Sequence, residues 1–194
     1  MPVPPFDIHG VIPPFLGLRP TNGADLSPYR VSPVEVVSAL GTTPDRRDIL
    51  RKWLQHRAQL RALGMTGFQW LNGSFTEKKN PNDLDIASFL RRPPTAQSLV
   101  DFKQLVQQNP TLFNLPLVKS TFRLDAYFVD LNGSPDTIVE FTRYFGGLFA
   151  HRRWDYLWKG MLRVELTNST THDATATVEL DTLHLLATPT RGVS

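Results

Sequence analysis

The chain has 194 residues, of which 41% are hydrophobic and 20% charged, as is ordinary for a soluble globular protein of about one domain. It contains no cysteine, which excludes a disulfide framework, a zinc–thiolate site and a cysteine nucleophile. The formal net charge of +3 suits an anionic ligand such as a phosphate, but it is too small to indicate nucleic-acid binding by itself.

Residues 1–33 hold eight prolines and are predicted to form an extended arm. Proline fixes φ and removes a backbone donor, so it favours extended chain and turns. The apolar residues between the prolines, among them Val11, Ile12 and Phe15, are too many for a free tail. We therefore expect the arm to pack on the domain and cover apolar surface.

The cellular location follows from what the sequence lacks. The first residues, MPVPPFDIHG, have no basic stretch followed by a long apolar run, so we expect no signal peptide. No segment approaches the roughly 20 apolar residues that a membrane-spanning helix needs. We expect a cytoplasmic protein that does not contact a membrane.

Two helices are predicted after the arm, over 34–40 and from about 45 to 63. Ser32–Pro33 and Thr43–Pro44 each supply an N-cap followed by proline at the first helical position. On the second helix, Arg46, Arg47, Arg51, Lys52 and Arg57 supply a charged face. Such a face either is solvated or forms a phosphate-binding stripe, and the solvated face is the more common case.

Strands and helices then alternate through a predicted core over 64–168. Strands are predicted over 66–72, 83–90, 121–131 and 161–166, with helices over 95–108 and 137–144 and a loop before residue 121. The C-terminal segment, 169–188, is predicted to contain a helix over 171–187. The sequence thus predicts one α/β (α+β) domain over 34–188, with a mixed sheet of about four or five strands covered by helices.

Three aspartates stand at positions where a core strand would not normally carry charge. Asp83 and Asp85 are two apart on a predicted strand, so their side chains point the same way, while Leu84 and Ile86 point into the core. Asp125 lies on the third predicted strand, among apolar residues. If the two strands are neighbours, three like charges converge, and a divalent cation would remove the repulsion. Such an Asp pair in isolation more often lies at a solvated sheet edge.

Gly73–Ser74 ends the first predicted strand and adds groups that can hold a phosphate to this site. Glycine lets the backbone approach a ligand closely, and the serine hydroxyl with the following amides can hold phosphate oxygens. Lys78, Lys79, Arg153 and Lys159 are candidate phosphate contacts from the surrounding loops, and each could equally be a solvated or structural charge.

The run Gly73–Ser74, eight intervening residues, then Asp83–Leu84–Asp85 resembles the G-S…D-x-D motif of the polymerase-β-like nucleotidyltransferase superfamily. Asp125 falls where that superfamily has its third carboxylate. The segments GFQWLNGSF, NPNDLDI, LDAYFVDL and KGMLRVEL, with GVIPPF and SPY in the arm, are similar to an uncharacterised family of small bacterial and phage nucleotidyltransferase-like proteins. The resemblance spans roughly residues 8–166. Asn82 departs from it, since many members carry serine before the first aspartate.

The resemblance implies a nucleotidyltransferase-type fold and the transfer of NMP from an NTP to a hydroxyl. Asp83 and Asp85 would ligate two Mg²⁺ or Mn²⁺ ions, and Asp125 would ligate the catalytic ion and help activate the hydroxyl. Gly73 and Ser74, with Lys78, Arg153 and Lys159, would hold the nucleotide. The acceptor would be a protein side chain, an RNA end or a small molecule. Small members often work beside a cognate protein partner, as in toxin–antitoxin or phage-defence pairs.

Two other classes of function stay open at this stage. A catalytically silent protein with the same fold would act as a nucleotide sensor or interaction partner, although retention of all three carboxylates favours the enzyme. A basic nucleic-acid-binding module would need a coherent basic face, and the scattered Arg and Lys positions make a long nucleic acid the weakest of the candidate partners.

Overall fold

The computed structural model describes residues 2–187, in which five strands form one mixed sheet in the order β1-β5-β2-β3-β4. The strands are β1 (Tyr29–Val31), β2 (Thr66–Asn72), β3 (Leu84–Arg91), β4 (Leu124–Asp130) and β5 (Leu162–Leu166). β1 is parallel to β5 and β3 is parallel to β4, whereas β2 is antiparallel to both of its neighbours. The expected mixed α/β class and strand number are confirmed.

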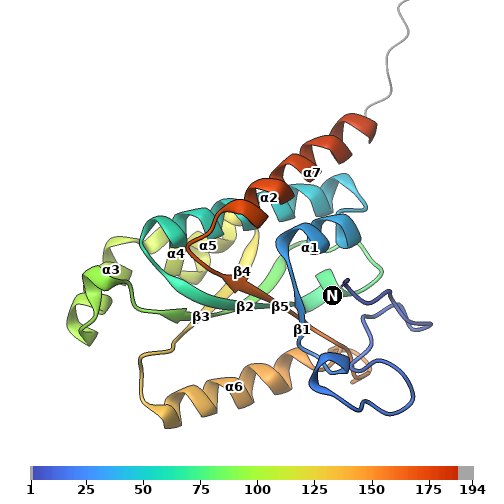
Figure 1. Ribbon diagram of the computed structural model, residues 1–194, viewed down its shortest axis with the longest axis horizontal. Helices are drawn as coiled ribbons and strands as arrows, with labels where there is room; N and C mark the ends of the chain where they lie inside the picture. Colours follow the sequence, from blue (N-terminus) through green and yellow to red (C-terminus); the bar gives the residue numbers. More distant parts are fainter. Residues whose placement is uncertain (1, 188–194) are drawn as a thin grey trace, which may run out of the picture.

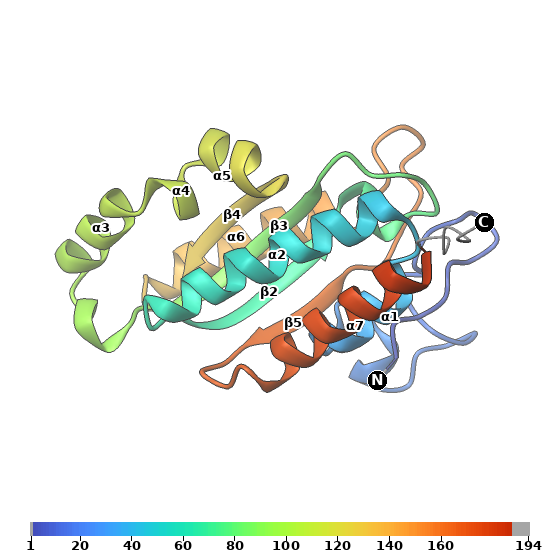
Figure 2. The same ribbon diagram turned by 90° about the horizontal axis from the view of Figure 1, so that it is seen from above.

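Seven α-helices lie within these residues: α1 (Pro33–Leu40), α2 (Pro44–Ala62), α3 (Leu99–Gln108), α4 (Pro110–Phe113), α5 (Leu115–Phe122), α6 (Pro135–Phe149) and α7 (Thr171–Ala187). Figure 1 shows α6 on one face of the sheet and α1, α2, α5 and α7 on the other. In Figure 2, α2 and α7 run side by side over the sheet, and α3 to α5 follow one another along its β4 side. Three short 3₁₀ turns also occur, of which η2 (Gly73–Thr76) bears on the site.

The two faces of the sheet belong to two apolar clusters. In β3, Leu84 and Ile86 are buried in the larger cluster, with α2, α5 and α7, while Ala87 and Phe89 belong to the smaller one, with α6. Side chains alternate along a strand, so Asp85 shares the α6 face with Ala87 and Phe89. It stands near the start of β3, beyond the apolar part of that face.

The predicted starts of α1 and α2 are confirmed. The Ser32 hydroxyl accepts a hydrogen bond from the Glu35 amide while the Glu35 carboxylate accepts one from the Ser32 amide, which forms a capping box. Thr43 caps α2 by accepting a hydrogen bond from the Arg46 amide at 3.3 Å.

The segment expected to be an arm contributes directly to the sheet. Residues 29–31 form β1, which pairs with β5 at the sheet edge. Val11 and Ile12 are fully buried, whereas Ile8 and Leu18 are almost fully exposed. The prediction of an extended arm over the whole of 1–33 therefore missed a strand, because three residues beside a proline give too short a pattern to identify.

The prediction of a loop before residue 121 and a strand from 121 is wrong. Residues 110–113 and 115–122 are helical, and β4 begins only at Leu124. Asn114 caps α5, and Arg123 adopts a left-handed conformation (φ 56°) that ends it. Val118 and Phe122, four residues apart, are both buried, so this short helix is stabilised by packing rather than by its length.

Of the last two helices, α6 is longer than predicted and α7 matches its prediction. α6 continues beyond Tyr144 to Phe149, through Gly146 and Gly147, because Phe145 and Phe149 are buried against the sheet. α7 matches the predicted helix, and residue 188 lies outside the described residues. Within residues 2–187 no helix combines the length and apolar character needed to cross a membrane.

The solvated basic face predicted for α2 is wrong for three of its five residues. Arg46, Arg47 and Arg57 are buried, and their guanidinium groups bond to neighbouring segments rather than to water. Arg57 pairs with Asp173 and so docks α7 on α2. A buried arginine and a solvated one cannot be told apart by helical spacing alone.

Candidate functional site

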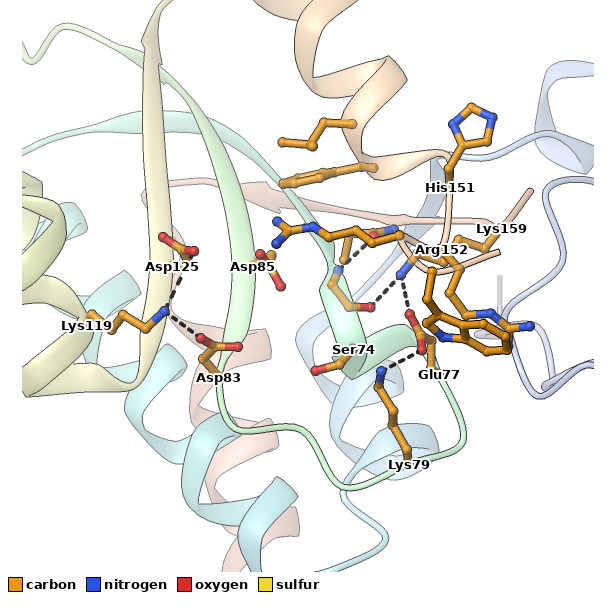
Figure 3. Close-up of a pocket in the computed structure, with 16 residues that line it drawn as sticks. Ser74, Glu77, Lys79, Asp83, Asp85, Lys119, Asp125, His151, Arg152 and Lys159 are labelled. Carbon is orange, nitrogen blue, oxygen red and sulfur yellow. Dashed lines mark hydrogen bonds and ion pairs between the residues drawn. The ribbon is translucent and has the colours of Figure 1, made fainter. Parts of the chain in front are cut away.

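Asp85 and Asp125 are direct partners across two neighbouring parallel strands. In the β3–β4 register Asp85 stands opposite Asp125, one step after Leu84 stands opposite Leu124. Neighbouring strands are about 4.8 Å apart, so the two carboxylates begin side by side on the α6 face. Asp83 lies one residue before β3, and Figure 3 shows all three carboxylates around the same space.

These carboxylates form one wall of a cavity of about 280 Å³. Eight of the nine residues expected at the site line it: Gly73, Ser74, Lys79, Asp83, Asp85, Asp125, Arg153 and Lys159. Lys78 does not; its side chain is exposed, whereas its neighbour Lys79 lines the cavity. The last turn of α6 and the loop over 151–154 close the opposite side.

Gly73 lies directly against the Asp85 carboxylate. Its φ is +71°, and a Cβ built on it would stand 1.5 Å from Asp85 Oδ2. The Asn72 side chain accepts a hydrogen bond from the Gly73 amide and donates one to the Gly160 carbonyl, which fixes the turn between β2 and η2. The close approach expected of this glycine is thus made to a carboxylate of the site itself.

Asp85 is the most constrained of the three carboxylates. Burial, followed by the charges of Asp83 and Asp125, raises the pKa of Asp85, and Arg153 and Lys159 oppose this only in part. Within residues 2–187 no donor is hydrogen-bonded to its carboxylate. A half-buried acid with two acidic neighbours and no donor is a favourable position for a bound cation.

Lys119, on α5, is a site residue that the sequence prediction missed. Its Nζ lies 2.8 Å from Asp83 Oδ2 and 3.8 Å from Asp125 Oδ2 (Figure 3). The hydrogen bond to Asp83 and the three aspartate charges raise the pKa of Lys119, so it stays a cation. Asn114 and Pro116, a capping residue and a first-turn proline, were the signal that would have placed Lys119 on a helix.

Glu77 and Lys159 form a buried ion pair at the other side of the cavity. Lys159 Nζ lies 2.8 Å from Glu77 Oε1 and donates to the Gly73 carbonyl at 2.6 Å. Burial lowers the pKa of Lys159. Burial alone would raise the pKa of Glu77, but the hydrogen bond from Lys159 outweighs it and holds that pKa below its ordinary value. Lys159 therefore fixes the Gly73 turn instead of standing free to contact a phosphate.

Arg46 orders the loop that follows η2. Its guanidinium donates to the carbonyl oxygens of Phe75, Glu77 and Lys79. Three carbonyls held by one buried cation fix the backbone over 75–79. Lys79, at the end of this backbone, lines the cavity, where its ammonium is 3.0 Å from Glu77 Oε2.

Cations also line the side of the cavity that is formed by the loop after α6. Arg152 pairs with Asp155, donates to the His9 carbonyl at 3.0 Å, and lies over the Trp154 ring at 4.1 Å. Arg153 lines the same cavity and forms no hydrogen bond or ion pair with the described part of the chain. Arg153 is thus the cation best placed to bind an anionic ligand.

The donor set suits a hard divalent cation, since three carboxylates around one space are the oxygen ligands that Mg²⁺ and Mn²⁺ prefer. In the present arrangement, no three His, Cys, Asp or Glu side chains between residues 2 and 187 are disposed to hold one metal ion. Lys119 occupies the position between Asp83 and Asp125. Its side chain is more than half exposed, so it can move away without unfolding α5.

Comparison with known proteins gives a family and nothing more specific. A family model described as a family of unknown function (DUF6932) matches residues 4–165, which include β1 to β4 and every residue of the cavity. No curated protein and no solved structure matches the chain.

Proposed function

We propose that this chain, which belongs to the family of unknown function DUF6932, is a metal-dependent nucleotidyltransferase that transfers NMP from an NTP to a hydroxyl acceptor. One observation carries the proposal: Asp85 and Asp125 are in register on neighbouring parallel strands, with Asp83 beside them and the Gly73–Ser74 turn against Asp85. This combination brings three carboxylates and the Gly73–Ser74 turn, a candidate for holding phosphate oxygens, to one cavity.

The nucleotide would lie with its phosphates between the Gly73–Ser74 turn and the loop after α6. The Ser74 hydroxyl, which bonds to no residue in the described part of the chain, would donate to a phosphate oxygen. Arg153 would offer two parallel hydrogen bonds from the other side. Lys159 would act indirectly, by holding the Gly73 carbonyl and so the turn.

In the reaction, the acceptor oxygen bonds to the α-phosphorus while the bond from that phosphorus to the bridging oxygen breaks. Pyrophosphate leaves with the bonding electron pair, and the acceptor proton passes to the Asp125 carboxylate. Mg²⁺ or Mn²⁺ held by Asp83, Asp85 and Asp125 would neutralise charge on the attacking and leaving oxygens. Asp85, tightly packed on Gly73, keeps its orientation throughout.

Lys119 favours a second candidate, a catalytically silent sensor or interaction protein. An ammonium group that already neutralises Asp83 and approaches Asp125 removes part of the need for a metal ion. The two candidates differ in one respect that can be measured: only the enzyme needs a metal ion for tight NTP binding.

The test is a thermal-shift screen of the four NTPs with Mg²⁺, Mn²⁺ or EDTA. A ligand at about 100 times its Kd stabilises the folded state by about 2.7 kcal/mol, which raises the Tm by several degrees. We expect this shift only with metal, and expect Asp85→Asn to abolish it. Glu140→Gln is the matched control, because it removes one carboxylate charge on an exposed part of α6 outside the cavity.

A shift of equal size in EDTA would favour the sensor. The absence of a shift with every NTP and metal would contradict both the enzyme and the nucleotide sensor, and would leave the interaction protein. Equal loss of the shift in Asp85→Asn and Glu140→Gln would mean that net charge, rather than the carboxylate site, governs binding.

A further inference from the structure

Trp154 is an exposed aromatic side chain that lines the carboxylate cavity. It belongs to the loop over 151–158, which follows α6. Trp154 is 70% exposed, whereas tryptophan is highly buried on average in folded proteins. Aromatic side chains are frequent in the walls of ligand sites, so this ring is a candidate ligand contact that the phosphate and metal groups of the site leave unused.

The backbone of this loop is held by hydrogen bonds. His151 and Trp158 form an antiparallel bridge at its base. At its tip the Tyr156 amide donates to the Arg152 carbonyl at 2.9 Å, and Tyr156 adopts a left-handed conformation with φ of 56°. These bonds fix the backbone that carries Trp154.

Arg152 covers one face of the Trp154 ring. Its guanidinium carbon lies 4.1 Å from the ring centroid, where a cation is attracted by the ring quadrupole. The guanidinium is itself held by the Asp155 carboxylate and donates to the His9 carbonyl at 3.0 Å. Because one face is covered and the residue is still 70% exposed, the other face of the ring is open to a ligand.

The neighbouring residue indicates which ligand fits. Arg153 lines the same cavity and forms no ion pair with the described part of the chain, and a guanidinium binds phosphate well. An indole face binds a flat aromatic group by stacking. A ligand that satisfies both residues carries an anionic group and a flat ring close together, as a nucleotide does.

The ring also lies on the appropriate side of the cavity. Figure 3 shows Arg152, which contacts the Trp154 ring, on the side of the cavity away from Asp125. A base stacked on Trp154 therefore leaves the carboxylate side free for the metal ions and the reacting phosphate.

We propose that Trp154 stacks on the base of the bound nucleotide, and that the site therefore favours purine over pyrimidine NTPs. A purine has the larger ring system and covers more of the indole face, and modest base preferences of this kind arise from stacking strength. The inference rests on the proposed binding of an NTP in the carboxylate cavity and adds the group that recognises the base.

The test is isothermal titration calorimetry of the full chain with each of the four NTPs and with inorganic triphosphate, always with Mg²⁺. Triphosphate has the anionic groups of the NTPs but no base. Trp154→Ala should weaken the binding of ATP and GTP by roughly 5- to 150-fold, as removal of a stacked aromatic ring does, and that of triphosphate by less than about twofold. In the wild type ATP and GTP should bind about threefold or more tightly than CTP and UTP, and Trp154→Ala should abolish this preference.

Trp158 is the matched control. It is 62% exposed in the same loop but does not line the carboxylate cavity. Trp158→Ala should leave the affinity for every NTP within about twofold of the wild type, since its ring contacts no ligand there. Two replacements of Trp154 separate stacking from simple apolar contact: Trp154→Tyr keeps a flat ring and should recover most of the affinity for ATP, whereas Trp154→Leu should not. Equal recovery by both would overturn the stacking proposal.

Triphosphate separates this inference from the proposed function. Asp85→Asn should weaken the binding of ATP and triphosphate together, whereas Trp154→Ala should weaken that of ATP alone. Equal weakening of both by Trp154→Ala, or no weakening of either, would overturn the stacking proposal and leave the proposed function intact. If neither ATP nor triphosphate binds the wild type with Mg²⁺, the proposed function fails and this inference fails with it.

Discussion

Gly73, the first residue of η2, and Asp85 of β3 form one unit at the residue scale. The positive φ of Gly73 and the missing Cβ together let the Asp85 carboxylate pack on its Cα. A side chain at this position would push the carboxylate away from Asp83 and Asp125. The glycine is therefore required by the geometry of the acidic site as well as by the turn.

Gly73→Ala should destabilise the protein far more than Gly17→Ala. Both glycines have φ near +70°, but a Cβ at Gly17 meets nothing within 4 Å. Left-handed backbone alone costs about 1–2 kcal/mol, and the collision with Asp85 should add about 1–3 kcal/mol at Gly73. Urea unfolding measures both.

Measuring Gly73→Ala in the Asp85→Ala variant tests whether the collision with the Asp85 carboxylate causes the additional cost. There the cost of Gly73→Ala should fall close to that of Gly17→Ala, because the colliding carboxylate is gone and only the Cβ of residue 85, 3.0 Å from the added Cβ, remains. An undiminished cost would show that the backbone, and not Asp85, requires glycine.

At the scale of elements, α7 is docked on α2 by a buried ion pair. Asp173 accepts hydrogen bonds from Arg57 and Arg61 at 2.7–3.1 Å. Burial raises the pKa of Asp173, but these two arginines outweigh it and hold the pKa below its ordinary value. An exposed pair, Arg51–Asp181, joins the same two helices.

Asp173→Asn should cost about 3–5 kcal/mol of folding stability, because Arg57 would be left as a buried, uncompensated charge. Asp181→Asn removes the same charge from the same helix and should cost less than about 1 kcal/mol, since both partners are exposed. Similar costs in chemical denaturation would contradict a specific role for Asp173 in docking α7.

Elements with a strong local signal could be predicted from the sequence, and elements formed by tertiary packing could not. Ser32 and Thr43 fixed the helix starts because capping is local, and the period-two alternation around Asp85 and Asp125 identified their shared face. The eight-residue α5 has too few turns for a periodic pattern, so Lys119 was missed. Which of Lys78 and Lys79 faces the cavity could not be predicted, because Arg46, far away in sequence, holds the backbone of this loop.

At the scale of the whole molecule, acid stability depends on a buried histidine between three helices. His56 of α2 lies edge-on to Phe122 of α5, and a ring nitrogen is 3.2 Å from the Leu112 carbonyl of α4. Burial lowers the pKa of His56 to about 4. The charge of Arg57 also lowers this pKa, whereas the hydrogen bond to Leu112 raises it in part. The folded protein therefore holds this histidine neutral.

Stability should fall as pH decreases from about 6.5 to about 4, because in this window the unfolded chain binds a proton at His56 and the folded chain does not. The loss attributable to His56 is about 3 kcal/mol. His56→Gln should remove it, whereas the exposed His172→Gln should not. Denaturation midpoints at pH 6.5 and 4 measure the difference, and equal acid sensitivity in wild type and His56→Gln would contradict this role.

Binding of Mn²⁺, measured by electron paramagnetic resonance with and without a non-hydrolysable NTP analogue, tests the carboxylate site most directly. We predict that the analogue strengthens Mn²⁺ binding in the wild type, that Asp85→Asn abolishes this binding, and that Lys119→Gln tightens it because the competing ammonium is gone. Glu140→Gln should behave as the wild type does. Mn²⁺ binding that is unchanged in Asp85→Asn, or lost in Lys119→Gln, would contradict a metal site on Asp83, Asp85 and Asp125.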